Sequence, residues 1–186
     1  MSTRRIASFA LVAFVALSIA AQAVAAGPQA SSQAEPKSAP ELLTSDTPRS
    51  TPGGATFTVP TGWSIATGKD IVTLSPPETD THIVIFDSHA ADAKVAVAEA
   101  WAAYRRDAKW PLKLITPRPA RNGWEDRQVF DYETSPNERA VVQAIASRAG
   151  NAWTVVILDG REPTFEKRAA PIRLIVQSLR PKGYQR

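Results

Sequence analysis

Between residues 55 and 107 the apolar positions first follow the two-residue period of strands and then the longer period of a helix. Short segments that alternate or are rich in β-branched residues predict four strands, over 55–60, 64–67, 71–75 and 81–86. The apolar residues that follow recur on one helical face: Ala93, Val97, Ala100, Trp101 and Tyr104. We expect Asp92 to cap this helix, which should end near Asp107, and Trp110-Pro111 to prevent its continuation.

The second half of the chain predicts an antiparallel meander followed by a helix. Strands are expected over 112–115, 125–134, 139–148 and 152–158, with turns at 135–138 and at Gly150-Asn151. Apolar residues at helical spacing predict a helix over 163–179, which Pro171 should kink or split. The order of strands, helix, strands and helix, without βαβ alternation, indicates an α+β fold in which two main helices pack on an antiparallel sheet.

The first 54 residues differ in composition from this globular part. Arg4 and Arg5 precede an apolar run over 6–20, and Ala23-Val24-Ala25 supplies small residues, which together predict a secretory signal peptide over 1–26. The run of about 15 residues is shorter than the about 20 that span a bilayer. Residues 27–54 are rich in Pro, Ser, Ala, Thr and Gly, so we expect a disordered linker before a single domain over 55–186. We therefore expect a periplasmic or secreted protein without a membrane span after signal cleavage.

The charge pattern adds one candidate surface. The net charge of +4 falls to about +2 once Arg4 and Arg5 are removed, which is too balanced to indicate nucleic-acid binding. A basic stretch nevertheless runs from Arg105 to Arg121. This stretch is either a solvated helix end and loop or a contact for an anionic surface. Trp110 and Trp124, which lie in the same region, are either packing anchors or a stacking and docking surface. The candidate contact residues are Lys109, Trp110, Lys113, Arg118, Arg121 and Trp124.

Catalytic and metal-binding patterns are sparse. The sequence after the signal peptide has no G-x-S-x-G elbow, no Ser-x-x-Lys pair and no P-loop, and Ser135-Pro136-Asn137 has the composition of an ordinary turn. His82 and Asp87 should lie on opposite faces of one strand, so we expect neither a metal site nor a cofactor. The carboxylates of Asp131 and Glu133 are expected to pair with Arg139 or Arg148 across the hairpin.

Four segments resemble known families. Gly54-Ala55-Thr56-Phe57-Thr58-Val59-Pro60-Thr61-Gly62-Trp63 resembles the opening of PsbP-like domains. Residues 102–114, 130–139 and 178–184 are similar to the N-terminal domain of secreted serine hydrolases of the β-lactamase-related family. The resemblance covers nearly all of 54–186 and implies an accessory domain, after which a penicillin-recognising hydrolase domain would be expected to follow at about residue 186. It transfers no catalytic residue, because it does not reach the catalytic segments of that family.

Three hypotheses follow from the sequence. The first is an exported, non-catalytic accessory module that binds or positions a partner, such as a serine hydrolase domain or a cell-envelope component. The second is a truncated serine hydrolase that lacks its Ser-x-x-Lys domain. The third is a cell-envelope binding module that uses the basic stretch with Trp110 and Trp124. The sequence identifies neither the ligand nor the oligomeric state.

Overall fold

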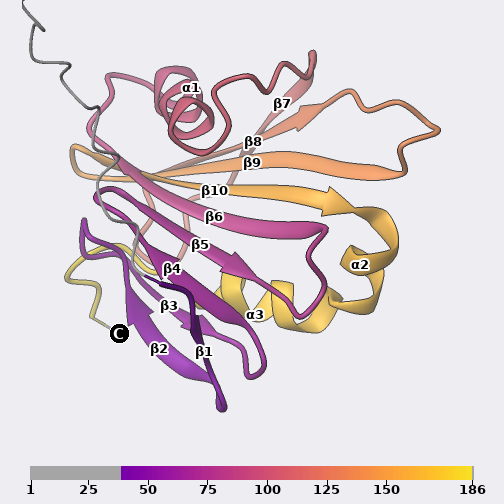
Figure 1. The fold of residues 1–186 in the computed structure, drawn as a ribbon. Helices are drawn as coiled ribbons and strands as arrows, with labels where there is room; N and C mark the ends of the chain where they lie inside the picture. Colours follow the sequence, from indigo (N-terminus) through magenta and orange to yellow (C-terminus); the bar gives the residue numbers. More distant parts are fainter. Residues whose placement is uncertain (1–38, 186) are drawn as a thin grey trace, which may run out of the picture. The chain divides into compact units, whose positions relative to one another are not determined.

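A computed structural model describes residues 39–185, which form a large antiparallel sheet with helices on both faces (Figure 1). The strands are β1 Glu41–Leu42, β2 Thr47–Ser50, β3 Thr56–Val59, β4 Ser64–Thr67, β5 Ile71–Ser75, β6 Thr81–Ser88, β7 Leu112–Arg118, β8 Asp126–Tyr132, β9 Ala140–Ala149 and β10 Ala152–Arg161. The helices are α1 Ala93–Tyr104, α2 Glu162–Lys167 and α3 Ala169–Ser178. Eight strands pair in the order β1-β4-β5-β6-β10-β9-β8-β7, and β2 pairs separately with β3. The predicted α+β fold is confirmed.

The middle of the sheet is formed by β6 and β10, whose apolar runs are buried on both faces. Successive side chains of a strand point to opposite faces. Val84 and Phe86 accordingly pack in the cluster under α1, whereas Ile83 and Ile85 pack in the cluster under α3. Strands β9 and β8, which complete the predicted meander with β10, flank this pair on one side, and β5 and β4 flank it on the other.

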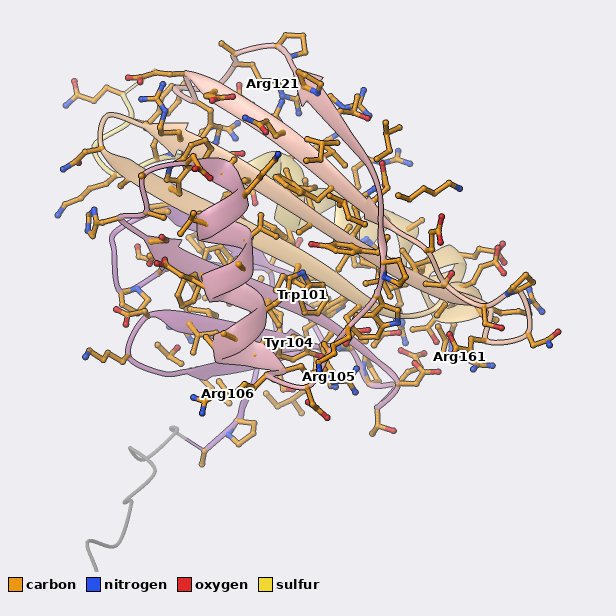
Figure 2. All side chains as sticks on the ribbon, turned by 90° about the horizontal axis from the view of Figure 1, so that it is seen from above. Trp101, Tyr104, Arg105, Arg106, Arg121 and Arg161 are labelled. Carbon is orange, nitrogen blue, oxygen red and sulfur yellow. The ribbon has the colours of Figure 1, made fainter. Side chains whose placement is uncertain are left out.

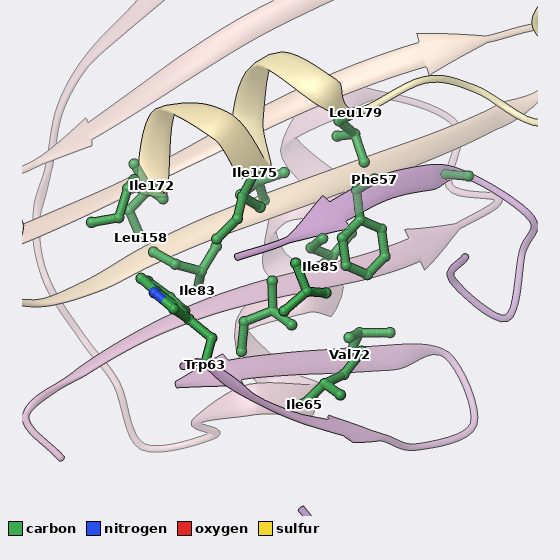
Figure 3. Packing of buried hydrophobic residues seen from close by; sticks show 14 of the residues in the cluster. Phe57, Trp63, Ile65, Val72, Ile83, Ile85, Leu158, Ile172, Ile175 and Leu179 are labelled. Atoms are coloured by element: carbon green, nitrogen blue, oxygen red, sulfur yellow. The ribbon is translucent and has the colours of Figure 1, made fainter. Parts of the chain in front are cut away.

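Two different layers cover the sheet. Helix α1 lies on one face, and α3 lies on the other face together with the β2-β3 pair (Figure 1). The core on the α3 face contains the largest fully buried side chains, among them Phe57, Trp63 and Ile175 (Figure 3). Within residues 39–185, no helix combines the length and the apolar character that a membrane crossing needs.

The expected disordered linker is wrong for residues 41–54. Leu43 is only 5% exposed, and its backbone N–H donates to the carbonyl oxygen of Trp63 at 2.9 Å. Strand β2 pairs along its length with β3. This segment contributes backbone hydrogen bonds and one buried leucine rather than a run of apolar side chains, which is why its composition resembles a linker. The signal peptide and the remaining linker residues lie outside the described part of the chain.

Proline positions explain two features of the element boundaries. The predicted splitting of the C-terminal helix into a short and a longer piece is confirmed: the break lies at Arg168, so that Pro171 falls in the first turn of α3, where a missing N–H costs nothing. Strand β7 extends beyond the predicted end at residue 115 and through Pro117. Because β7 is the last strand of the sheet, this proline needs no partner on its outer side.

Candidate functional site

A cleft opens where α1 ends and the chain turns towards β7. It consists of two hollows that share Arg105 and Trp110, and we call it the α1 cleft. The first hollow, of about 270 Å³, is lined by Trp101, Arg105, Arg106, Trp110 and Tyr132. The second, of about 320 Å³, is lined by Asp80, His82, Arg105, Trp110, Asp159 and Arg161. Figure 2 shows Trp101, Tyr104, Arg105 and Arg106 gathered at this end of the helix.

Aromatic rings form one wall of the α1 cleft. The ring of Trp101 lies 5.3 Å from that of Trp110 and 5.6 Å from that of Tyr132, measured between centroids. The Trp101 indole N–H donates to the Tyr132 hydroxyl at 2.9 Å. Burial raises the pKa of Tyr132, so its hydroxyl stays protonated at neutral pH. The wall therefore offers aromatic faces held in place by a hydrogen bond.

A charged network lies beside this wall. One carboxylate oxygen of Asp159 accepts a hydrogen bond from the Tyr104 hydroxyl at 2.9 Å and another from Arg105 Nη1 at 3.0 Å. The Asp159 side chain is only 10% exposed, whereas half of the Arg105 side chain faces solvent. Burial, together with the Asp159 charge, raises the pKa of Tyr104. Tyr104 is thus a neutral donor, and Arg105 is fixed with its guanidinium at the mouth of the cleft.

The guanidinium of Arg105 connects the two hollows. Its central carbon lies 5.7 Å from the centre of the Tyr104 ring and 6.0 Å from that of Trp110, within the range of cation–π attraction. His82 is opposite Asp159 in the β6–β10 register, and its ring packs edge-on against Tyr104. Its Nδ1 lies 3.1 Å from the Ser75 hydroxyl. The site therefore joins residues from α1, β6 and β10 with the loop before β7.

The structure separates the predicted basic surface into two parts. Lys109 and Trp110 lie at the α1 cleft end of β7, next to the exposed Lys113 on the strand itself. Arg118 and Arg121 lie at the opposite end, where Figure 2 shows Arg121 far from the labelled residues of α1. A strand of this length separates its two ends by about 20 Å. The basic stretch is therefore not one contact surface.

Trp124 is a packing anchor, so its assignment to a surface is wrong. It is 5% exposed, and its indole N–H donates to the carbonyl oxygen of Leu179 at 3.3 Å. It follows a tight turn in which Asn122 and Gly123 both have positive φ, and Arg121 bridges to Trp124. The Asn-Gly pair is the strongest local signal for such a hairpin turn, and it predicts that the following residue returns to the sheet.

The remaining candidates have structural roles. Ser135 and Glu138 close the β8–β9 turn through their backbone groups. Arg139 pairs with Glu162 and Arg148 with Glu125, so the expected pairing with Asp131 and Glu133 is wrong. Asp87 accepts from the backbone N–H of Gly53, on the face opposite His82. Within residues 39–185, no group of three or more His, Asp or Glu side chains is placed to hold a metal ion.

No family model and no curated protein matches this chain. Among solved structures, the chain is similar to the solution structure of cyanobacterial PsbP (CyanoP) from Synechocystis sp. PCC 6803, with a TM-score of 0.54 and 15% sequence identity. The fold is PsbP-like. The match covers 75% of this chain and 94% of the cyanobacterial protein. The likeness concerns the PsbP-like fold alone, so the chemistry of the α1 cleft must be judged from its own residues.

Proposed function

We propose that this protein is an exported, non-catalytic binding module of the cell envelope and that the α1 cleft is its binding site. The observation that carries the proposal is the pair of hollows joined by Arg105 and Trp110, with aromatic faces on one side and the Asp159 network on the other. Sites for small ligands combine such apolar walls with a few fixed polar groups. The predicted signal peptide supports export.

The residues around the α1 cleft favour a saccharide over a polyanion. Its rim carries both signs of charge, because Arg161, Asp80 and Glu138 all line the second hollow. A polyanion would meet repulsion from the carboxylates, whereas a sugar can use donors and acceptors of both kinds. The ring of Trp110 is half-buried, which leaves part of its face for stacking against a pyranose.

The test is co-sedimentation of the purified exported protein with isolated peptidoglycan. We expect saturable binding that Trp110→Ala weakens by about tenfold, the loss of one stacking contact. Leu114→Ala is the matched control, because Leu114 is 56% exposed on β7 and lies outside the lining of both hollows. Equal retention of both variants and the native protein at all concentrations would contradict a role for the cleft.

The finer proposal, an accessory module of a secreted serine hydrolase, is supported by where the resembling segments lie. Residues 102–114 and 130–139 contribute Arg105, Trp110 and Glu138 to the α1 cleft. Two of the four resembling segments therefore contribute to the proposed binding site. A hydrolase frame in the DNA directly beyond codon 186 would support the truncated hydrolase, whereas unrelated sequence there would support a stand-alone accessory module. Hydrolysis of nitrocefin that a substitution in this chain abolishes would contradict the non-catalytic role.

A further inference from the structure

Three arginines gather at the end of the sheet opposite the α1 cleft. Arg118 on β7 is directly opposite Arg127 on β8 in the antiparallel register, so both side chains lie on the same face. Arg121 follows in the turn that joins the two strands. Like charges placed opposite each other across two strands are destabilising unless something neutralises them. We call Arg118, Arg121 and Arg127 the arginine triad.

The described chain supplies no carboxylate to the arginine triad: none of the three forms an ion pair within residues 39–185. The carboxylates that precede Arg127 in the chain are engaged elsewhere. Glu125 pairs with Arg148 at 3.2 Å, and Asp126 accepts from the Gln128 amide at 3.5 Å. The described residues therefore do not compensate the excess of positive charge at this end.

Arg127 is the least solvated member of the triad. Its Nε is buried and has no hydrogen-bond partner, and its Nη1 reaches only the carbonyl oxygen of Pro119, at 3.5 Å. Burial lowers the pKa of the Arg127 guanidinium, and the charges of Arg121 and Arg118 lower it further. A bound anion would give the unused donor of this half-buried cation a hydrogen-bond acceptor, and it would offset the charges of the two cationic neighbours.

A small hollow lies beside these groups. It measures about 10 Å³ and is lined by Arg121 and Arg127 together with Ser147 of β9 and Leu179 after α3. This volume admits about one water-sized atom, such as a single oxygen of a larger anion. The remaining oxygens of such an anion would lie above it, towards the exposed guanidinium of Arg118.

We propose that the arginine triad binds a tetrahedral oxyanion, a phosphate group, which bridges the three guanidinium groups and neutralises them. Guanidinium groups match phosphate geometry through paired N–H donors, and such charge-assisted hydrogen bonds are the strong ones. A free phosphate ion and a lipid headgroup both present such a group. The site is about a strand length from the α1 cleft and shares no lining residue with it.

The experiment is calorimetric titration of the purified exported protein with inorganic phosphate against a background of constant ionic strength. We expect saturable binding that Arg127→Gln and Arg118→Gln each weaken by about tenfold, the loss of one charge-assisted contact. Arg139→Gln is the control, because it removes the same charge from an ion-paired arginine at the far end of β9. Phosphate binding that is absent, or equal in all four proteins, overturns the proposal.

Two further measurements keep the outcome clear. In chloride alone, Arg118→Gln should unfold at the same temperature as the native protein or at a higher one, because it removes a repulsion between like charges. A clear decrease in the unfolding temperature would contradict the inference that the charges of the triad are uncompensated.

Flotation with vesicles identifies the source of the phosphate group. Binding to phosphatidylglycerol but not phosphatidylcholine vesicles, lost in Arg127→Gln, indicates a lipid headgroup. Titration without flotation indicates a soluble phosphate. We expect Trp110→Ala, which should weaken peptidoglycan binding, to leave both the phosphate titration and the vesicle flotation unchanged.

Discussion

The two faces of the eight-stranded sheet are built from different kinds of side chain. On the α3 face, Trp63 is 1% exposed and Ile175 is fully buried, and large apolar residues pack between α3 and the strands (Figure 3). On the α1 face the helix buries mostly alanines, and Trp101 and Tyr104 of its last turn gather with the rings of Trp110 and Tyr132. The comparison teaches that the α3 face is closed by large buried side chains, whereas the α1 face leaves aromatic and charged groups partly exposed at the end of its helix.

The largest expected effect is on the α3 face. Ile175→Ala removes a fully buried side chain and leaves a cavity against β3 and β6, so we expect the free energy of unfolding to fall by about 2–5 kcal/mol. Urea unfolding followed by circular dichroism measures it. Trp110→Ala is the contrast on the other face: the side chain is larger but half-exposed, and we expect a loss below about 1.5 kcal/mol. A larger loss for Trp110→Ala than for Ile175→Ala would contradict the division between the faces.

Most of the fold could be predicted from local patterns. The strands predicted over 64–67 and 71–75 match the observed bounds of β4 and β5, and Gly150-Asn151 identified the β9–β10 turn. The Asp92 cap is confirmed, since its side chain accepts from the backbone N–H of Val95. Strands β1 and β2 had no such signal, because they are short and join the fold chiefly through backbone hydrogen bonds with β4 and β3.

The α1 cleft was harder to predict because it is assembled from distant parts of the chain. Trp110 was recognised, but Asp159 is the polar end of an apolar strand, and its role depends on pairing with Tyr104 and Arg105, which lie more than 50 positions earlier. Trp110 and Arg118 were also predicted to belong to one contact surface, because both follow α1 closely in the sequence. An extended strand then carries Arg118 to the far end of the sheet, a separation that a list of charges cannot show.

The next largest effect is expected in the α1 cleft network. Asp159→Ala removes the acceptor shared by Tyr104 and Arg105, and we expect a loss of about 1–3 kcal/mol from the unfolding free energy, the cost of unsatisfied donors. Asp159→Asn keeps an acceptor oxygen without the charge and should lose less. In both variants the pKa of Tyr104 should fall, because one of the causes that raise it is removed, although burial still keeps it above its ordinary value. Alkaline spectrophotometric titration measures this shift, and an unchanged Tyr104 titration would show that Asp159 is not its partner in solution.

The smallest effect concerns an ion-pair cluster that ties the β5–β6 loop to the α2–α3 junction. Glu78 accepts from Arg168 at 3.0 and 2.8 Å and pairs with Lys167 at 2.7 Å. The hydrogen bond from Arg168, followed by that from Lys167, lowers the pKa of Glu78 from 4.5 to about 2. A carboxyl group whose pKa is lower in the folded state stabilises the fold above its unfolded pKa of 4.5, and this contribution disappears as the pH falls towards 2.

Glu78→Gln tests this contribution directly. The native protein should be more stable than the variant at about pH 6, and the difference should vanish by about pH 2, because only the charged carboxylate binds the two cations more strongly than an amide does. Glu166→Gln on α2 is the control, since its carboxylate is exposed and has no ion-pair partner within the described chain. Urea unfolding at both pH values measures the difference, which concentrated salt should reduce because the pair is partly exposed to solvent. A difference that persists unchanged at about pH 2 would mean that Glu78 acts through packing rather than charge.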